Sequence, residues 1–278
     1  MAQSADFSEL NRNKQLFERY LSSRDTNILK QLASRAVEKD YGANASGYLE
    51  QLASKMSGHE TEVKNIIFPS LLSAISSTNL PNPRAAILAL SEFVDLYPTT
   101  VQSLTSVLPQ FYTYIDEHRF GESSKALIRI ITKPSKLDPN TIKLLRKLLQ
   151  TSDDKVTLRN SPLSSVRVEA IDAIGMHLQA NPELTVEIES CLDDKNPFVA
   201  AAAMFVLVKN GFVSDRLCTR IAHFLETEGD PQYLLLEHLD ELKSIPKCMF
   251  SSLNRLNDSN NREISALAES LVKKIDSK

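Results

Sequence analysis

Three pairs of a polar residue followed by proline recur at near-even intervals in the C-terminal half of the chain. They are Ser161-Pro162, Asn196-Pro197 and Asp230-Pro231, and their prolines stand 35 and 34 residues apart. Ser, Asn and Asp side chains accept a hydrogen bond from a free N–H at a helix start, and proline fits the first helical position. The spacing therefore predicts helix starts at a regular interval, which is typical of a stacked helical repeat.

Helical periodicity continues through the rest of the chain. Apolar residues from Leu104 to Ile115 fall three and four positions apart, as on one face of an amphipathic helix. Sustained strand alternation is absent, and glycine is scarce, at 7 of 278 residues. The pattern predicts an all-α fold with short connections. The expected helices are 7–22, 25–39, 43–57, 60–78, 82–97, 99–118, 122–132, 138–151, 162–180, 182–193, 197–210, 214–228, 231–243, 246–257 and 260–276.

The longest apolar run covers Phe198–Val208. It is shorter than the roughly 20 residues that a membrane span needs, so we expect a helix buried inside a protein and no transmembrane segment. Acidic residues near the start, Asp6 and Glu9, argue against a signal peptide. We expect a soluble, cytoplasmic protein, with the nucleus left open. Three cysteines form an odd set in a long chain, so Cys191, Cys218 and Cys248 are predicted to be reduced core residues.

The segment Ser164–Ala170 reads Ser-Ser-Val-Arg-Val-Glu-Ala and resembles the start of the second helix of a HEAT repeat, an armadillo-like two-helix unit. At an offset of 33 residues, the apolar positions Val166, Ala170, Ala173 and Ile174 match Val199, Ala203, Val206 and Leu207. The resemblance implies a right-handed α-solenoid of about six to seven antiparallel helix pairs. It would form a single domain over residues 1–278, with a bend near 151–161.

Other positions fit the HEAT pattern less evenly. Pro69 and Pro109 fall inside otherwise helical patterns, similar to the kinking proline of HEAT first helices. The second matched unit has Ala200 where the family's arginine would stand, and Asp193 and Asp194 supply the acids of the preceding loop. Tetratricopeptide repeats share the interval, but their tryptophan and glycine signature is missing. The segment Leu192–Val199, followed by alanines, also looks like a repeat in the trunk subunits of vesicle-coat adaptors.

Catalytic motifs are sparse. The sequence has no glycine-rich phosphate loop, no Cys-x-x-Cys pair and no Gly-x-Ser-x-Gly elbow, although a dispersed Ser/His/Asp arrangement is left open. Iron-dependent hydroxylases built on HEAT repeats use repeated His-Glu dyads, and only His59-Glu60 has that order here. We interpret this dyad as a helix start, because a metal needs several converging ligands. We therefore predict no catalytic residues, no metal and no cofactor.

Charged residues cluster in two stretches. The basic stretch is predicted to form part of a partner-binding surface, and it consists of Lys125, Arg129, Lys133, Lys136, Lys143, Arg146 and Lys147. The acidic stretch is a second candidate surface, or a mate for the basic stretch of another copy, and it consists of Glu226, Glu228, Asp230, Glu237, Asp240 and Glu241. Solvated helix faces are the alternative interpretation of both. Whether the basic side chains converge is left open. If they do, they would suit an acidic protein segment, an anionic lipid headgroup or a nucleic-acid backbone.

The sequence predicts a non-catalytic scaffold or adaptor that binds a protein partner within a larger complex. Solenoids present extended surfaces, which suits this role. The net charge of −3 and the lack of tryptophan argue against a nucleic-acid partner. Two alternatives are kept. One is an adaptin-like subunit or fragment of a vesicle-coat complex, associated with membranes through that complex, and the other is a HEAT-repeat metal-dependent hydroxylase.

Overall fold

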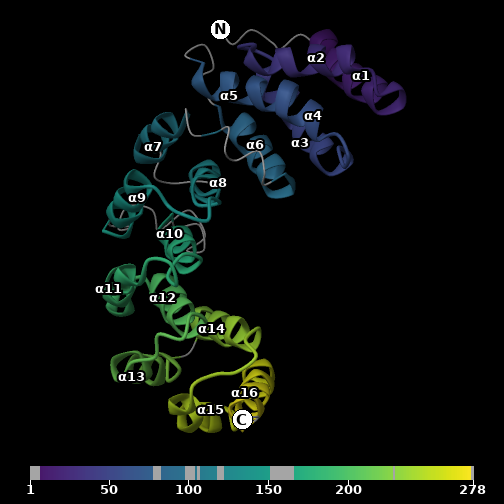
Figure 1. The fold of residues 1–278 in the computed structure, drawn as a ribbon. Helices are drawn as coiled ribbons and strands as arrows, with labels where there is room; N and C mark the ends of the chain where they lie inside the picture. Colours follow the sequence, from purple (N-terminus) through teal and green to yellow (C-terminus); the bar gives the residue numbers. More distant parts are fainter. Residues whose placement is uncertain are drawn as a thin grey trace, which may run out of the picture. The chain divides into compact units, whose positions relative to one another are not determined.

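The computed structural model describes residues 7–77, 83–97, 104, 107–117, 122–150, 166–227 and 229–276, and among these residues it contains helices and no strand (Figure 1). The predicted all-α class is therefore confirmed. Contacts divide the chain into two compact units, Met1–Pro134 and Ser135–Lys278. The bend expected at 151–161 lies outside the described residues, and the single domain over 1–278 stays a prediction.

The first unit is a set of helices in which α3 packs against α6 and α6 packs against α8. Helices α2 and α5 contact each other beside this row, and α7 packs on α8. Its elements are α1 (Phe7–Ser23), α2 (Thr26–Ser34), η1 (Arg35–Val37), α3 (Gly42–Leu52), η2 (Ala53–Lys55), α4 (Glu60–Glu62), η3 (Val63–Ile67), α5 (Phe68–Ser76), α6 (Arg84–Leu96), α7 (Leu108–Glu117) and α8 (Glu122–Ile131).

A buried guanidinium joins the first helices of this unit. Arg35 is 7% exposed, and its Nε donates to Asn13 Oδ1 of α1. Its Nη2 lies 2.9 Å from Glu9 Oε2, and its Nη1 lies 3.4 Å from Glu38 Oε2. A buried charge is tolerated only when partners surround it, as they do here. The cluster therefore serves the packing of α1 on η1.

The two prolines expected to kink helices behave differently. Pro69 stands inside a continuous helical segment, as the second residue of α5 after the π-helical turn Val63–Ile67. Proline has no N–H to donate, and the wider turn before it accommodates the missing bond. Pro109 is the second residue of α7, and the first turn of a helix tolerates proline. Most residues just before α7 lie outside the described part of the chain, so the kink expected at Pro109 stays a prediction.

The second unit stacks alternate helices. Helix α10 packs on α12, α12 on α14 and α14 on α16, while α9, α11 and α15 each pack on the next helix in the chain (Figure 1). The elements are α9 (Pro139–Leu149), α10 (Val166–Gly175), η6 (Pro182–Leu184), α11 (Thr185–Ser190), η7 (Cys191–Asp193), α12 (Pro197–Lys209), α13 (Asp215–Phe224), α14 (Asp230–Asp240), η8 (Lys247–Met249), α15 (Phe250–Leu256) and α16 (Arg262–Asp276).

Helix α12 forms the centre of this unit. Every residue from Val199 to Val208 is buried, which confirms the buried helix predicted from the apolar run. Gly175, at the end of α10, lets the two helices approach closely, because a Cβ there would lie 2.7 Å from Val206 Cγ1. The residues matched at an offset of 33 are buried in both helices. The 33-residue spacing therefore reflects equivalent core positions in α10 and α12.

A salt bridge connects α10 to the loop before α12. Arg167 and Asp194 are both largely buried, and Arg167 Nη1 lies 3.2 Å from Asp194 Oδ1, while Nη2 donates to the second carboxylate oxygen. The two parallel bonds hold a planar guanidinium against a carboxylate, which is a strong and directional arrangement. The same carboxylate accepts the backbone N–H of Asn196 at 2.9 Å. One aspartate thus fixes both the previous helix and the start of the next.

Of the three polar-proline pairs, Asn196-Pro197 begins a helix as predicted, and a further pair, Asp138-Pro139, does the same. Asn196 accepts from Phe198 at 3.0 Å and caps α12, and Asp138 accepts from Asn140 at 2.9 Å and caps α9. Asp230 is instead the first residue of α14, and Gly229 precedes it as the cap. The expectation that Asp230 caps its helix is therefore wrong. Ser161-Pro162 lies outside the described residues.

Candidate functional site

Three residues of the predicted basic stretch belong to the first unit. Lys125 is buried in α8, and its Nζ lies 3.1 Å from Glu122 Oε1. Lys133 Nζ lies 2.6 Å from Asp95 Oδ1. Arg129 is exposed on α8. Lys125 and Lys133 are therefore compensated by acids of their own unit.

The other four basic residues lie on or beside α9 in the second unit, and Lys136, Lys143, Arg146 and Lys147 are all exposed. The leucines of α9 are buried on its other side, so its cations project outward. Arg146 Nε lies 2.6 Å from Glu187 Oε1 of α11. Because the stretch is divided between two units, its role as one continuous surface stays a prediction.

Two residues of the acidic stretch have basic partners from later helices. Glu226 Oε1 lies 2.8 Å from Arg255 Nη2. Asp240 Oδ1 lies 2.7 Å from Lys274 Nζ and accepts the Ser270 hydroxyl at 2.7 Å. These hydrogen bonds, the lysine's foremost, hold the pKa of Asp240 below its usual range. The acidic stretch is thus partly neutralised by α15 and α16.

The remaining acids of the stretch differ in position. Glu237 and Glu241 are exposed, and Glu228 lies outside the described residues. Asp230 is exposed at the start of α14 and contributes to a cleft. The structure therefore brings Glu226 and Asp230 to one cavity and leaves Glu237 and Glu241 outside its wall.

The cleft lies where the turn between α13 and α14 meets the turn between α15 and α16, and its volume is about 1010 Å³. This is at the upper end of the sizes usual for ligand sites. Its walls are Leu225, Glu226, Gly229, Asp230, Gln232, Tyr233, Ser252, Arg255, Leu256, Asp258, Ser259, Asn260, Asn261, Glu263 and Ile264.

The two turns that form the cleft are shaped by their own residues. Gly229 has φ 129°, a backbone region that strains residues with a side chain, and it turns the chain into α14. Asn261 accepts the backbone N–H of Glu263 at 3.0 Å and so caps α16. Ser265 Oγ donates to the carbonyl of Asn257 at 2.7 Å and holds the start of that turn. Local backbone geometry and capping therefore fix both the α13–α14 turn and the α15–α16 turn.

The charge of the cleft is negative. Glu226 is matched by Arg255, whereas Asp230, Asp258 and Glu263 form no ion pair with any residue of the described part of the chain. Two helices begin at the cleft and two end there, so their opposite end dipoles largely offset one another. The side chains decide the sign, and they favour a positively charged ligand.

One wall residue carries an unmatched polar atom. Gln232 is 3% exposed, and its Nε2 donates to the Leu225 carbonyl at 2.7 Å. This bond fixes the orientation of the amide, and Oε1 has no hydrogen-bond partner. A buried acceptor without a donor costs about 1–3 kcal/mol. The cleft is therefore lined by carboxylates, whereas the unmatched amide oxygen of Gln232 is buried and has almost no accessible surface.

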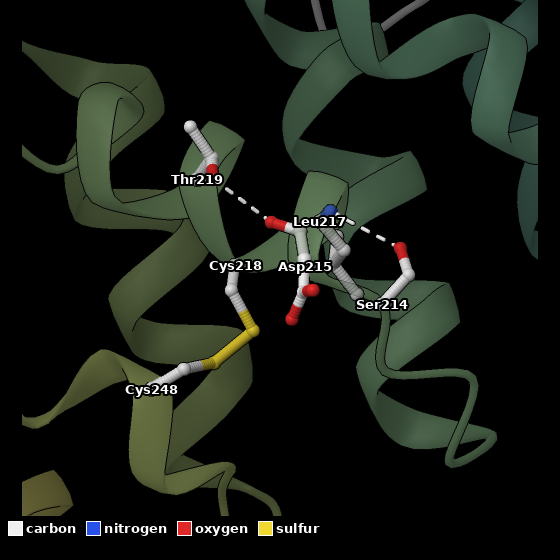
Figure 2. The surroundings of a disulfide bond; sticks show 6 residues. All are labelled: Ser214, Asp215, Leu217, Cys218, Thr219 and Cys248. Atoms are coloured by element: carbon white, nitrogen blue, oxygen red, sulfur yellow. Dashed lines mark hydrogen bonds between the residues drawn. A yellow bond between two sulfur atoms is a disulfide. The ribbon is translucent and has the colours of Figure 1, made fainter.

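A disulfide lies at the other end of the same helices. Cys218 in α13 and Cys248 in η8 are bonded, with their Cα atoms 5.9 Å apart (Figure 2). The prediction that these two cysteines are reduced core residues is wrong, because the stacking of consecutive helix pairs brings cysteines 30 residues apart to bonding distance. Cys191 is buried and free, as predicted, and burial raises the pKa of its thiol.

Figure 2 also shows how α13 begins beside this bond. Ser214 Oγ accepts the backbone N–H of Leu217 at 3.2 Å, and Thr219 Oγ1 donates to the Asp215 carbonyl at 2.9 Å. Cys248 is exposed, and Cys218 is half-buried. The disulfide is thus accessible to solvent, and it links α13 to η8, the short helix just before α15.

The His59-Glu60 dyad lies at the start of α4. His59 Nδ1 lies 3.3 Å from Glu62 Oε1, and Glu60 is the first residue of α4. Among the described residues, no group of three or more His, Cys, Asp or Glu side chains is placed to hold a metal ion. Nor does any helix in that part of the chain have the length and apolar character to cross a membrane.

Sequence reasoning identified only part of the cleft. Glu226 and Asp230 were named as acids of one stretch, but Arg255, Asp258 and Glu263 come from the following helix pair. The turn sequence Asn257–Asn261, Asn-Asp-Ser-Asn-Asn, signals a polar loop. Its position against the previous turn depends on how the pairs stack. Nothing in the sequence indicated that Gln232 would be buried.

Comparisons with known proteins add little. No protein-family model matches the chain, and no curated protein matches it. Among solved structures, the crystal structure of an engineered protein aligns with 99% of this chain and 97% of its own, at 14% identity and a TM-score of 0.36. A score at that level carries no argument about fold or function.

Proposed function

We propose that the chain is a HEAT-like, right-handed α-solenoid that acts as a non-catalytic scaffold and binds a protein partner at the cleft of its second unit. The stacking of α10, α12, α14 and α16 supports the repeat architecture. So does the Arg167–Asp194 salt bridge, which links one helix pair to the loop of the next.

The observation that carries the binding proposal is the cleft itself. A cavity of about 1010 Å³ opens between two consecutive turns. Three of its carboxylates, those of Asp230, Asp258 and Glu263, have no ion-pair partner in the described part of the chain. A buried charge of the same unit is matched, as Asp194 is by Arg167. A binding surface keeps its charges available for the partner.

No specific observation favours either alternative function. The segment Leu192–Val199, which looks like a coat-adaptor repeat, is accounted for by packing, because Asp194 pairs with Arg167 and Asn196 caps α12. The hydroxylase alternative rests on one His-Glu dyad. Both therefore stay predictions, as do the absence of catalysis and the cytoplasmic location.

Site-specific photo-cross-linking in the source cells tests the proposal. A benzophenone amino acid replaces Tyr233 on the cleft wall, and in a matched control it replaces Glu237, which is exposed on the same helix outside the cleft. We expect one discrete partner to cross-link from position 233 and none from position 237. Adding the Asp258→Lys substitution to the 233 probe should abolish the product.

The outcome that contradicts the proposal is equal labelling from both positions, or a product that survives Asp258→Lys. The basic stretch is examined in the same assay. A benzophenone at Lys143 of α9, which is exposed, tests whether the partner also reaches that helix. A discrete product from Lys143 with none from Tyr233 would move the contact surface from the cleft to the basic stretch.

A further inference from the structure

We propose that the Cys218–Cys248 disulfide is a redox-sensitive switch that holds two walls of the cleft together when oxidised and frees one of them when reduced. Its effect on the partner rests on the proposed function, because the partner would bind at the cleft. The bond links α13 to η8, which runs directly into α15. Leu225 and Glu226, just after α13, and Arg255 of α15 line the cleft. The disulfide therefore joins the two segments that carry these walls.

The polar contact that joins the same two walls is weak. Glu226 Oε1 lies 2.8 Å from Arg255 Nη2, but the two side chains are 54% and 61% exposed, and exposed ion pairs contribute little to stability. Helix α13 itself buries only Leu217 and Ile221. The disulfide therefore restrains the approach of α13 to η8 more firmly than this ion pair does.

Other contacts of α13 lead away from the cleft, to the preceding helix pair. Arg216 and Arg220 both pair with Asp193, and Arg220 also donates to the Leu192 carbonyl. These acceptors belong to η7, which lies before α12 in the chain. Reduction of the disulfide leaves these contacts intact. Helix α13 therefore stays attached to η7 while it is released from η8, so one wall of the cleft moves without unfolding of the unit.

The position of the disulfide suits reversible reduction. Cys248 is exposed and Cys218 is half-buried, so a reductant reaches the bond in the folded protein. Exposed disulfides are the labile and regulatory ones, whereas enclosed structural disulfides resist reduction. We expect a cytoplasmic protein, and disulfides in that compartment are usually transient or redox-sensing. Burial raises the pKa of the Cys191 thiol, which makes this third cysteine a poor exchange partner.

The reaction is a thiol–disulfide exchange with a protein dithiol as the reductant. A thiolate of the reductant attacks Cys248 Sγ, the S–S bond breaks, and Cys218 leaves as a thiolate that takes a proton from water. The second thiol of the reductant loses its proton, attacks the mixed disulfide and releases Cys248, which is protonated in turn. The chain gains two electrons and two protons, and the reductant becomes a disulfide. Glutathione disulfide reverses the change by accepting the two electrons and leaving as two molecules of glutathione.

Thiol alkylation with mass spectrometry, paired with hydrogen exchange, tests the switch without the partner. A small dithiol reductant under native conditions should make Cys218 and Cys248 available to alkylation while circular dichroism stays unchanged. The backbone N–H groups of Leu225 and Glu226 are bonded to carbonyls at the end of α13, and they should exchange about fivefold faster after reduction. Glutathione disulfide should restore the slow rate. Reduction that requires a denaturant, or unchanged exchange at these two amides, would overturn the inference.

Two cysteine variants locate the effect. Cys248→Ser should show fast exchange at the cleft wall with or without the reductant. The matched control Cys191→Ala keeps the disulfide and should respond to the reductant as the original protein does. A Cys191→Ala variant that no longer responds would assign the effect to the buried thiol and would also overturn the inference.

Cross-linking measures the consequence for the partner. An extract of the source cells, with its own thiols alkylated beforehand, receives purified protein that carries benzophenone at Tyr233, either oxidised or with both Cys218→Ser and Cys248→Ser. We expect about fivefold less of the discrete product from the double variant, which corresponds to a binding-competent form reduced to about a fifth of the molecules. Equal product from both proteins overturns the inference and leaves the proposed function standing. Absence of the product from both removes the proposed function, whereas the exchange experiment still decides the switch.

Discussion

Helices α12 and α13 follow each other in the chain but are held in place by different means. Helix α12 has ten buried residues, from Val199 to Val208, and packs against both α10 and α14. Helix α13 buries only Leu217 and Ile221. Its position depends instead on a disulfide, a serine cap and ion pairs. The comparison shows that apolar burial fixes α12 in its unit. Helix α13, which borders the cleft, is held mainly by a disulfide, a cap and ion pairs.

The ion pairs of α13 reach back to the preceding loop. Arg216 Nη2 lies 2.6 Å from Asp193 Oδ2, and Arg220 Nε lies 2.9 Å from Asp193 Oδ1. Arg220 also donates to the Leu192 carbonyl at 3.2 Å. Exposed pairs of this kind contribute little each. The position of helix α13 should therefore respond to pH, salt and redox conditions more than that of α12.

The largest expected effect comes from a cavity in α12. Leu207 is completely buried, and Leu207→Ala should lower the free energy of unfolding by about 2–5 kcal/mol. Chemical denaturation followed by circular dichroism measures this change. Val213→Ala is the control, since Val213 is 46% exposed and its truncation should cost less than about 0.5 kcal/mol. Similar losses in both variants would contradict the central role of α12.

Removing the disulfide should lower the local stability of α13 and leave that of α12 unchanged. The bond joins residues 30 positions apart, so Cys248→Ser removes its restriction of the unfolded chain and should lower the free energy of unfolding by about 3–4 kcal/mol. We expect faster amide hydrogen exchange in α13 and η8, with exchange in α12 unchanged. A dithiol reductant should reproduce this pattern in the original protein and add nothing to the variant. Faster exchange throughout α12 would erase the distinction between the two helices.

The same contrast explains what the sequence could and could not predict. The apolar run from Phe198 to Val208 predicted α12, because burial on all sides leaves a continuous pattern in the chain. The ranges of most helices followed from periodicity for the same reason. The bond between Cys218 and Cys248 left no such pattern, since it depends on the distance between two helix pairs.

The cleft was also beyond sequence reasoning, apart from two of its acids. Charge counting found Glu226 and Asp230, but not that Arg255 would neutralise the first. The proline pair at Asp230 predicted a helix start correctly and its cap wrongly, because Gly229 turns the chain one residue earlier. The sequence offers several residues that could cap the same helix, such as Gly229 and Asp230 for α14. Tertiary contacts decide which of them does so.

A smaller effect is expected from the cap of α13. Ser214→Ala removes the acceptor for the Leu217 N–H and should cost about 1 kcal/mol. Ser214→Asp should retain most of that stability, because its carboxylate accepts the same bond and favours the helix dipole. Hydrogen exchange at the first turn of α13 provides the measurement. An unchanged exchange rate in Ser214→Ala would show that the disulfide alone orders this end of the helix.

The smallest effect concerns pH. Hydrogen bonding by Arg216, with the charges of Arg220 and Arg216 adding to it, holds the pKa of Asp193 below its ordinary value of 3.8. A lowered carboxyl pKa stabilises the fold above the unfolded value, and this contribution is lost as pH falls through the folded value. The attachment of α13 to η7 should therefore weaken below about pH 4, while α12, held by apolar contacts, should not respond.

An NMR titration of the Asp193 carboxyl measures this directly. Its midpoint should lie below 3.8 in the original protein and rise in Arg216→Gln, which removes the charge of the first-named partner. Because the pair is exposed, added salt should shift the original midpoint in the same direction. If neither Arg216→Gln nor added salt shifts the midpoint, Asp193 does not hold α13. The helix beside the cleft would then depend on its disulfide, its cap and two buried residues.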